Sequence, residues 1–130
     1  MLRDGRILNP RLLAALAGAG HTDLIIVADS GLPVPRGPEL IDLSLVPGTP
    51  QFLQVLETVT EALAFEAAVV ALETQAQDIY GPLRRRLGEV PVEAVPHEEF
   101  KRRVAQARTV IRTGECTPYA NVGLIAGVTF

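Results

Sequence analysis

The sequence has one cysteine, no tryptophan and few aromatic residues, and each shortage argues against a class of protein. Cys116 stands alone, so the chain can form neither an internal disulfide nor a cluster of thiolate metal ligands. Phe, Tyr and Trp make up 5% of the residues, which argues against a stacking platform for nucleic-acid bases. The net charge of -3 provides no basic footprint for a polyanion. We therefore expect no nucleic-acid partner, and we interpret Cys116 as a structural or incidental thiol.

Long apolar runs and cofactor motifs are also missing. The first six residues lack the apolar core of a secretion signal, and no segment approaches the length that crosses a bilayer. We therefore expect a cytoplasmic protein with no membrane partner. The two histidines are not spaced as His-x-x-x-His, the carboxylates do not cluster, and no phosphate-binding loop is present. These gaps predict a chain without a metal site.

The proportions of hydrophobic and charged residues are those of one globular domain. Of its 130 residues, 48% are hydrophobic and 21% are charged. No linker, repeat or low-complexity segment divides it, so we treat residues 1–130 as a single domain. Because aromatic residues are scarce, its core must be largely aliphatic.

Apolar runs alternate with helical patterns along the chain. The continuous run Leu24 to Ala28 predicts a strand buried on both faces. Further strands are predicted at 39–46, 65–72, 90–95, 109–111 and 122–128, and helices at 10–17, 50–63, 74–88 and 98–107. This order predicts an α/β fold: a single three-layer domain with a mostly parallel mixed sheet and helices on both faces. The last strand follows another strand directly, which favours an antiparallel pairing there.

Local signals predict where several helices begin and end. Asn9 and Thr49, each followed by proline, predict the N-caps of the first two helices. Gly18 and Gly20 predict a left-handed end to the first helix, and Gly81-Pro82 predicts a break in the third. Four glutamates are expected to face solvent: Glu66, Glu73 and the pair Glu98-Glu99.

Two titratable residues flank the strand predicted at 24–28. His21 comes just before it and Asp29 just after it, where open α/β sheets usually keep their chemistry. We therefore expect the rest of the chain to build one pocket around this pair. His97 opens a later helix, and Lys101 lies one turn beyond it as a possible further contact. Imidazole can both give and take a proton near neutral pH. A lone histidine is more often a surface or capping residue, and Asp29 could equally be a turn former.

Five segments together resemble the D-ribose pyranase family. They read Gly-His-Thr-Asp at 20–23, Asp-Ser-Gly-Leu-Pro-Val-Pro at 29–35, His-Glu-Glu-Phe-Lys at 97–101, Gly-Glu-Cys-Thr-Pro-Tyr-Ala-Asn at 114–121 and Ala-Gly-Val-Thr-Phe at 126–130. The related L-fucose mutarotases share some of these elements but lack the counterpart of His97. The chain departs from the family in having Ser30 where alanine is usual and a short 75–88 region.

The resemblance implies an isomerase that interconverts the pyranose and furanose forms of D-ribose without a cofactor. It implies His21 as the catalytic acid and base, with Asp29, His97, Tyr119 and Asn121 contacting the sugar. It also implies a homo-oligomer, a homodecamer of stacked pentameric rings, with sites at subunit boundaries. Two alternatives remain: a mutarotase for L-fucose or another monosaccharide, and a non-catalytic sugar-binding accessory protein.

Overall fold

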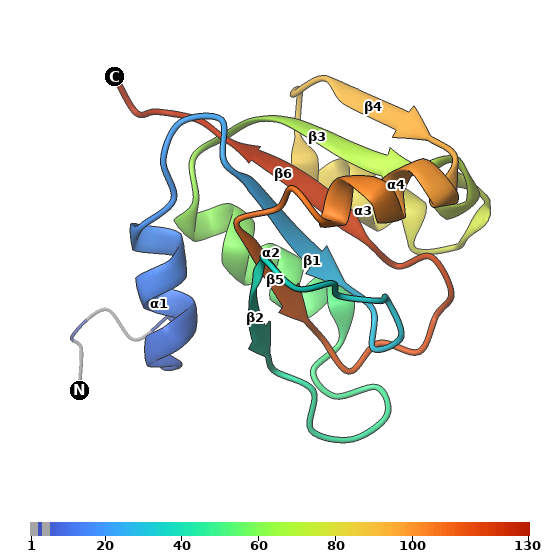
Figure 1. Cartoon of the computed structure of the whole chain (residues 1–130), viewed down its shortest axis with the longest axis horizontal. Helices are drawn as coiled ribbons and strands as arrows, with labels where there is room; N and C mark the ends of the chain where they lie inside the picture. The colour runs from blue at the N-terminus through green and yellow to red at the C-terminus, as the bar shows by residue number, and fades with distance from the viewer. Residues whose placement is uncertain (1–2, 4–5) are drawn as a thin grey trace.

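Six strands form one mixed sheet with the order β2-β5-β1-β6-β3-β4 (Figure 1). The computed structural model describes residue 3 and residues 6–130. Its strands are β1 (Leu24–Ala28), β2 (Glu39–Asp42), β3 (Phe65–Ala71), β4 (Val92–Val95), β5 (Thr109–Arg112) and β6 (Val122–Ala126). All neighbouring strands are parallel except β6, which runs antiparallel to both β1 and β3. The predicted mostly parallel mixed sheet and its antiparallel last strand are confirmed, although β6 does not pair with β5.

Strand β1 lies inside the sheet, between β5 and β6. Its residues Ile25, Ile26 and Val27 are fully buried, because helices cover both faces of the sheet. Alternate side chains of β1 enter two different hydrophobic cores, with Ile25 on one face and Ile26 on the other. The prediction of a strand buried on both faces is therefore confirmed.

The helices lie in two layers, one on each face of the sheet (Figure 1). Helices α1 (Pro10–Ala17), α2 (Phe52–Ala62) and α3 (Tyr80–Leu87) pack on one face, and α4 (His97–Val104) packs on the other. On the α4 face, Phe100 and Val104 bury their side chains against β1 and β3. This arrangement confirms the predicted three-layer domain with helices on both faces.

The first helix begins as predicted but ends differently. The side chain of Asn9 caps it by accepting a hydrogen bond from Leu12 N at 3.0 Å. Gly18, however, has φ -84°, so no left-handed glycine ends the helix. The left-handed residue of this corner is Thr22, with φ 73°. The corner is instead stabilised by the carboxylate of Asp23, which accepts a hydrogen bond from Gly20 N at 2.8 Å.

The second helix is capped from a distant part of the chain. Thr49 does not cap it, because the helix begins only at Phe52 and Thr49 pairs with Val46 in an isolated bridge. The Thr49-Pro50 peptide bond is cis. The free amide of Phe52 donates instead to Oε1 of Glu115 at 3.1 Å. The prediction of Thr49 as N-cap is therefore wrong, and a carboxylate from the 114–121 segment takes that role.

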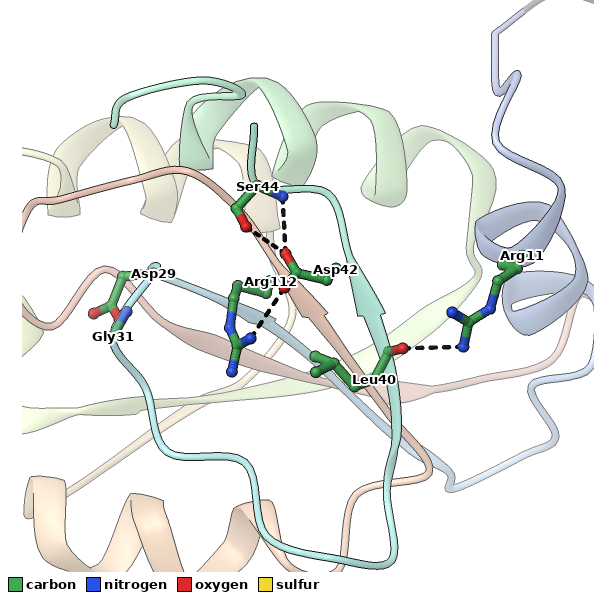
Figure 2. A network of polar contacts seen from close by, with 7 residues as sticks. All are labelled: Arg11, Asp29, Gly31, Leu40, Asp42, Ser44 and Arg112. Atoms are coloured by element: carbon green, nitrogen blue, oxygen red, sulfur yellow. Dashed lines mark hydrogen bonds and ion pairs between the residues drawn. The ribbon is translucent and has the colours of Figure 1, made fainter. Parts of the chain in front are cut away.

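Two other element boundaries differ from the sequence prediction. Strand β2 ends at Asp42, because its carboxylate accepts hydrogen bonds from the amide and hydroxyl of Ser44 and so turns the chain (Figure 2). The helix predicted at 74–88 divides into a 3-10 helix η1 (Leu72–Ala76) and α3. Gly81-Pro82 does not break α3, since it lies in the first turn, where proline is tolerated.

Candidate functional site

A cavity of about 300 Å³ opens where the parallel strands end. Strands β1, β3, β4 and β5 point their carboxyl ends to this edge of the sheet, and the antiparallel β6 begins there. The turn after β1, the first residue of α4 and the loop before β6 therefore meet. The cavity is lined by Asp29, Ser30, Gly31, Leu32, Pro33, His97, Glu115, Cys116, Thr117, Pro118 and Tyr119.

Asp29 is held in place on both sides of its carboxylate. It directly follows β1 and is 8% exposed. Its Oδ1 accepts a hydrogen bond from Gly31 N at 2.9 Å, and Figure 2 shows both residues where the chain leaves the strand. Its Oδ2 accepts one from Asn121 Nδ2 at 3.2 Å, while Asn121 Oδ1 accepts from Asp29 N at 2.9 Å. The reciprocal pair fixes the carboxylate at the cavity wall.

Asn121 lies behind Asp29 rather than at the cavity surface. Asn121 is fully buried, and its side chain forms hydrogen bonds with Asp29. In this chain Asn121 therefore orients the carboxylate, and the direct sugar contact implied by the resemblance stays a prediction.

His97 and Tyr119 face each other across the cavity lining. Their ring centroids are 4.9 Å apart and the ring planes meet at 79°, an edge-to-face contact. His97 Nδ1 is buried without a hydrogen-bond partner, so Nε2 is the ring nitrogen left for a ligand. Tyr119 has φ 61°, a conformation unusual for a residue with a side chain.

The loop before β6 is organised by Glu115, a role that local sequence patterns do not reveal. Besides capping α2, its carboxylate accepts a hydrogen bond from the Thr117 hydroxyl at 3.0 Å, and its carbonyl accepts one from Ser30 N at 2.9 Å. The adjacent Gly114 packs so closely that a Cβ there would lie 2.2 Å from Thr49 O. The glycine and the glutamate together hold this loop against the start of α2.

His21 is not part of this cavity. It precedes β1, while Asp29 follows it, and the five residues of the strand span roughly 16 Å between them at about 3.3 Å per residue. Its side chain is 51% exposed, and its Nε2 lies 3.0 Å from Oε2 of Glu66. Beside it, Thr22 and Asp23 border a second open hollow of about 550 Å³ over the sheet. One chain therefore brings Asp29, His97 and Tyr119 together but leaves His21 at the opposite edge. The expectation of one pocket around both His21 and Asp29 is wrong for a single chain, because β1 lies between them.

Three side chains near the cavity differ in what they contact. Lys101 binds Glu98 at 2.8 Å and does not line the cavity. The hydrogen bond from Lys101 lowers the pKa of the Glu98 carboxyl, which faces solvent as predicted. Glu73 does not simply face solvent: its half-buried carboxylate accepts hydrogen bonds from the backbone amide of His97. Cys116 lines the cavity as an exposed free thiol.

Across residue 3 and residues 6–130, no three His, Cys, Asp or Glu side chains are arranged to hold a metal ion. In the same part of the chain, none of the helices has the length and apolar character to cross a membrane.

A layered α/β domain with a polar cavity at the carboxyl ends of its parallel strands belongs to the class of small-molecule-binding α/β proteins. The sequence model of the RbsD / FucU transport protein family matches residues 2–129, and the chain belongs to this family. The resemblance inferred from the five sequence segments is therefore confirmed.

Individual relatives cover almost the whole chain. The D-ribose pyranase of Geobacillus kaustophilus is 52% identical over 131 residues, which cover 99% of this chain and 96% of that protein. The D-ribose pyranase of Symbiobacterium thermophilum is 53% identical over 131 residues, covering 99% of this chain and 100% of that protein. The solved structure of Bacillus subtilis RbsD complexed with D-ribose is 46% identical, covers 100% of both chains and has a TM-score of 0.94.

Proposed function

We propose that this protein catalyses the interconversion of the pyranose and furanose forms of D-ribose, the activity of a D-ribose pyranase. The observation that carries the proposal is the gathering of Asp29, His97 and Tyr119 around one sugar-sized cavity. The same fold is found in a relative that was solved with D-ribose bound. A carboxylate, an imidazole nitrogen and a phenol offer both acceptors and donors, which suits the hydroxyl groups of a neutral sugar.

The reaction needs only proton transfers. To open the pyranose, a base removes the proton of the anomeric hydroxyl while an acid protonates the ring oxygen, and the bond between that oxygen and the anomeric carbon breaks. To close the furanose, the hydroxyl one carbon nearer attacks the new aldehyde and loses its proton, while the carbonyl oxygen gains one. A group with a pKa near neutrality serves both directions. We assign this role to His21 and sugar contacts to Asp29, His97 and Tyr119, with Asn121 orienting Asp29.

The position of His21 implies that two copies of the chain build each site. Because β1 is a straight strand inside the sheet, His21 and Asp29 of one chain cannot approach each other. The exposed His21 and the open hollow beside it leave room for the cavity edge of a second copy. This requirement supports a homo-oligomer, and for its form we propose the homodecamer of stacked pentameric rings that the resemblance implies. We also infer a cytoplasmic location, where an exposed free thiol such as Cys116 stays reduced.

Two other functions remain for the experiment to separate. A mutarotase for L-fucose or another monosaccharide would use the same proton chemistry. His97 lines the cavity, and the family resemblance associates a histidine at this position with the ribose enzymes rather than the L-fucose enzymes, which favours ribose. An accessory protein would bind sugar and leave the ring forms to exchange spontaneously.

Saturation-transfer NMR on equilibrated D-ribose tests the proposal. Irradiating a pyranose signal in the presence of the protein should lower the furanose signals, and His21→Ala should abolish the transfer. Asp78→Ala changes an exposed residue away from the cavity and is the matched control. Transfer on L-fucose but not on D-ribose would favour the first alternative. Ribose binding without any transfer would favour the second and overturn the proposal.

A further inference from the structure

Two consecutive residues of η1 contact the two aromatic residues of the cavity. Both oxygens of the Glu73 carboxylate accept the backbone amide hydrogen of His97, at 3.1 and 3.2 Å. The next residue, Thr74, donates its hydroxyl to the carbonyl oxygen of Tyr119 at 2.6 Å. Neither side chain lines the cavity itself. The 3-10 helix thus binds the backbones of His97 and Tyr119 at adjacent points.

Thr74 stabilises an unusual backbone conformation. Tyr119 has φ 61°, where a side chain crowds the backbone, and such a residue persists only when its surroundings hold it. Its carbonyl accepts two hydrogen bonds, one from Thr74 and one from Asn121 N at 2.9 Å. Thr74 is fully buried, so water cannot replace its hydroxyl. The buried bond therefore fixes the direction in which the Tyr119 ring leaves the backbone.

Glu73 fixes the start of α4. His97 is the first residue of this helix, and the preceding Pro96 provides no side-chain cap. The free amide of His97 is therefore satisfied by a carboxylate from η1, where negative charge also suits the helix dipole. Because the amide and the imidazole belong to the same residue, this contact fixes the backbone position from which the ring extends toward Tyr119.

We propose that Glu73 and Thr74 are positioning residues that together set the edge-to-face contact of His97 and Tyr119 and thereby the affinity for the sugar. The inference rests on the proposed function and assigns residues outside the cavity to it. His97 Nδ1 has no partner, so its ring is not anchored through that nitrogen and depends on the backbone for its placement. Moving either backbone separates the two rings and misplaces Nε2 for a sugar hydroxyl.

The test combines Thr74→Val, Thr74→Ser and Glu73→Ala with measurements of ring-form exchange over a range of D-ribose concentrations. Thr74→Val preserves shape but removes the donor, and we expect its KM to rise about 5- to 10-fold with kcat changed less than about 2-fold. Thr74→Ser restores the hydroxyl and should return KM to within about 2-fold of the unchanged protein. Glu73→Ala should act in the same direction as Thr74→Val. Gln75→Ala, an exposed residue of the same 3-10 helix, is the matched control and should change neither constant.

A second measurement separates failure of this inference from failure of the proposed function. A nuclear Overhauser effect between the His97 and Tyr119 rings should be present in the unchanged protein and in Thr74→Ser, and should be weakened in Thr74→Val and Glu73→Ala. It reports the ring contact whether or not the protein exchanges ribose forms. An unchanged KM and an intact ring contact in Thr74→Val would overturn the inference. If Thr74→Val does not fold, a KM and a ring contact in the folded Glu73→Ala that match those of Gln75→Ala would do the same.

Discussion

His21 and Asp29 stand at opposite ends of the same buried strand, β1. The strand pairs on both sides, with β5 and β6, so its length is fixed and no loop movement shortens it. Each residue is therefore presented at a different edge of the sheet. Under the proposed function, the acid-base group of one chain acts on a sugar held mainly by its neighbour.

The first prediction concerns mixed assemblies of two inactive variants. His21→Ala and Asp29→Ala should each abolish ring-form exchange. When the two are unfolded together and refolded as mixed assemblies, about one quarter of the sites should combine an intact His21 with an intact Asp29. The measurement is the saturation-transfer rate of the mixture relative to the unchanged protein.

Two differently tagged variants purified in tandem ensure that only mixed assemblies are assayed. The matched control mixes two differently tagged His21→Ala preparations, which should stay inactive. If a mixture of verified composition shows no ring-form exchange, the site is not shared between chains.

The second prediction concerns the reciprocal pair of Asp29 and Asn121. Asn121→Ala leaves the buried carboxylate without its amide donor, so we expect the free energy of unfolding to fall by about 1–3 kcal/mol. Because the two side chains depend on each other, the double variant Asp29→Ala/Asn121→Ala should lose less than the sum of the single losses. Urea unfolding measures all three values. Strictly additive losses would contradict the coupling.

The third prediction concerns the loop that leads into β6. At Gly114 even an alanine Cβ would overlap Thr49 O, at 2.2 Å, so the backbone of the loop must shift. Gly114→Ala should therefore lower the free energy of unfolding by about 1–3 kcal/mol or more and weaken ribose binding. Gly81→Ala in α3 is the control, because its Cβ meets only the end of the Arg85 side chain at 3.6 Å. Equal stability of the two variants would argue against the close packing of this loop.

The fourth prediction concerns acid stability. The hydroxyl of Ser44, followed by its backbone amide and by Arg112, lowers the pKa of Asp42 from its ordinary value of 3.8 (Figure 2). A carboxyl with a lowered pKa in the folded state contributes stability above its unfolded pKa and loses it as the pH falls through the folded pKa. Since Asp42 is exposed, we expect this contribution to be less than about 1 kcal/mol.

Asp42→Asn should accordingly lose less stability than the unchanged protein when the pH falls from about 5 to about 3. Urea unfolding at several pH values measures the difference, and Asp78→Asn, an exposed carboxyl in the η1–α3 turn, is the control. An identical pH dependence in all three proteins would refute the role of Asp42.

Local patterns in the sequence predict the parts of the fold that depend on neighbouring residues. The apolar run of β1 and the Asn9 cap of α1 follow from side chains within a few positions of one another. The roles of Glu115 and Glu73 do not, because each carboxylate caps a helix that is distant in the chain. Thr22, rather than one of the nearby glycines, adopts the left-handed conformation. Its amide donates a hydrogen bond to Ala126 O, a contact between distant parts of the chain that local patterns do not reveal.

The candidate site likewise has some features that local sequence patterns predict and others that they do not. The positions of His21 and Asp29 at the two ends of a strand follow directly from the apolar run between them. Bringing His97 and Tyr119 beside Asp29 depends on the strand order, which periodicity alone does not specify. Their grouping was expected only through the family resemblance, and a contact such as Thr74 to Tyr119 leaves no local signal.

Strand β6 connects the two parts of the proposed site directly. Its first residues follow the loop that carries Tyr119, and its last residue, Ala126, exchanges backbone hydrogen bonds with Thr22 and Asp23 next to His21. This single strand thus connects the cavity, where we propose that the sugar binds, to His21, the proposed acid and base. If the proposed ring forms, deletion of a single residue from β6 is expected to disable two neighbouring sites at once, one on each side of the altered subunit.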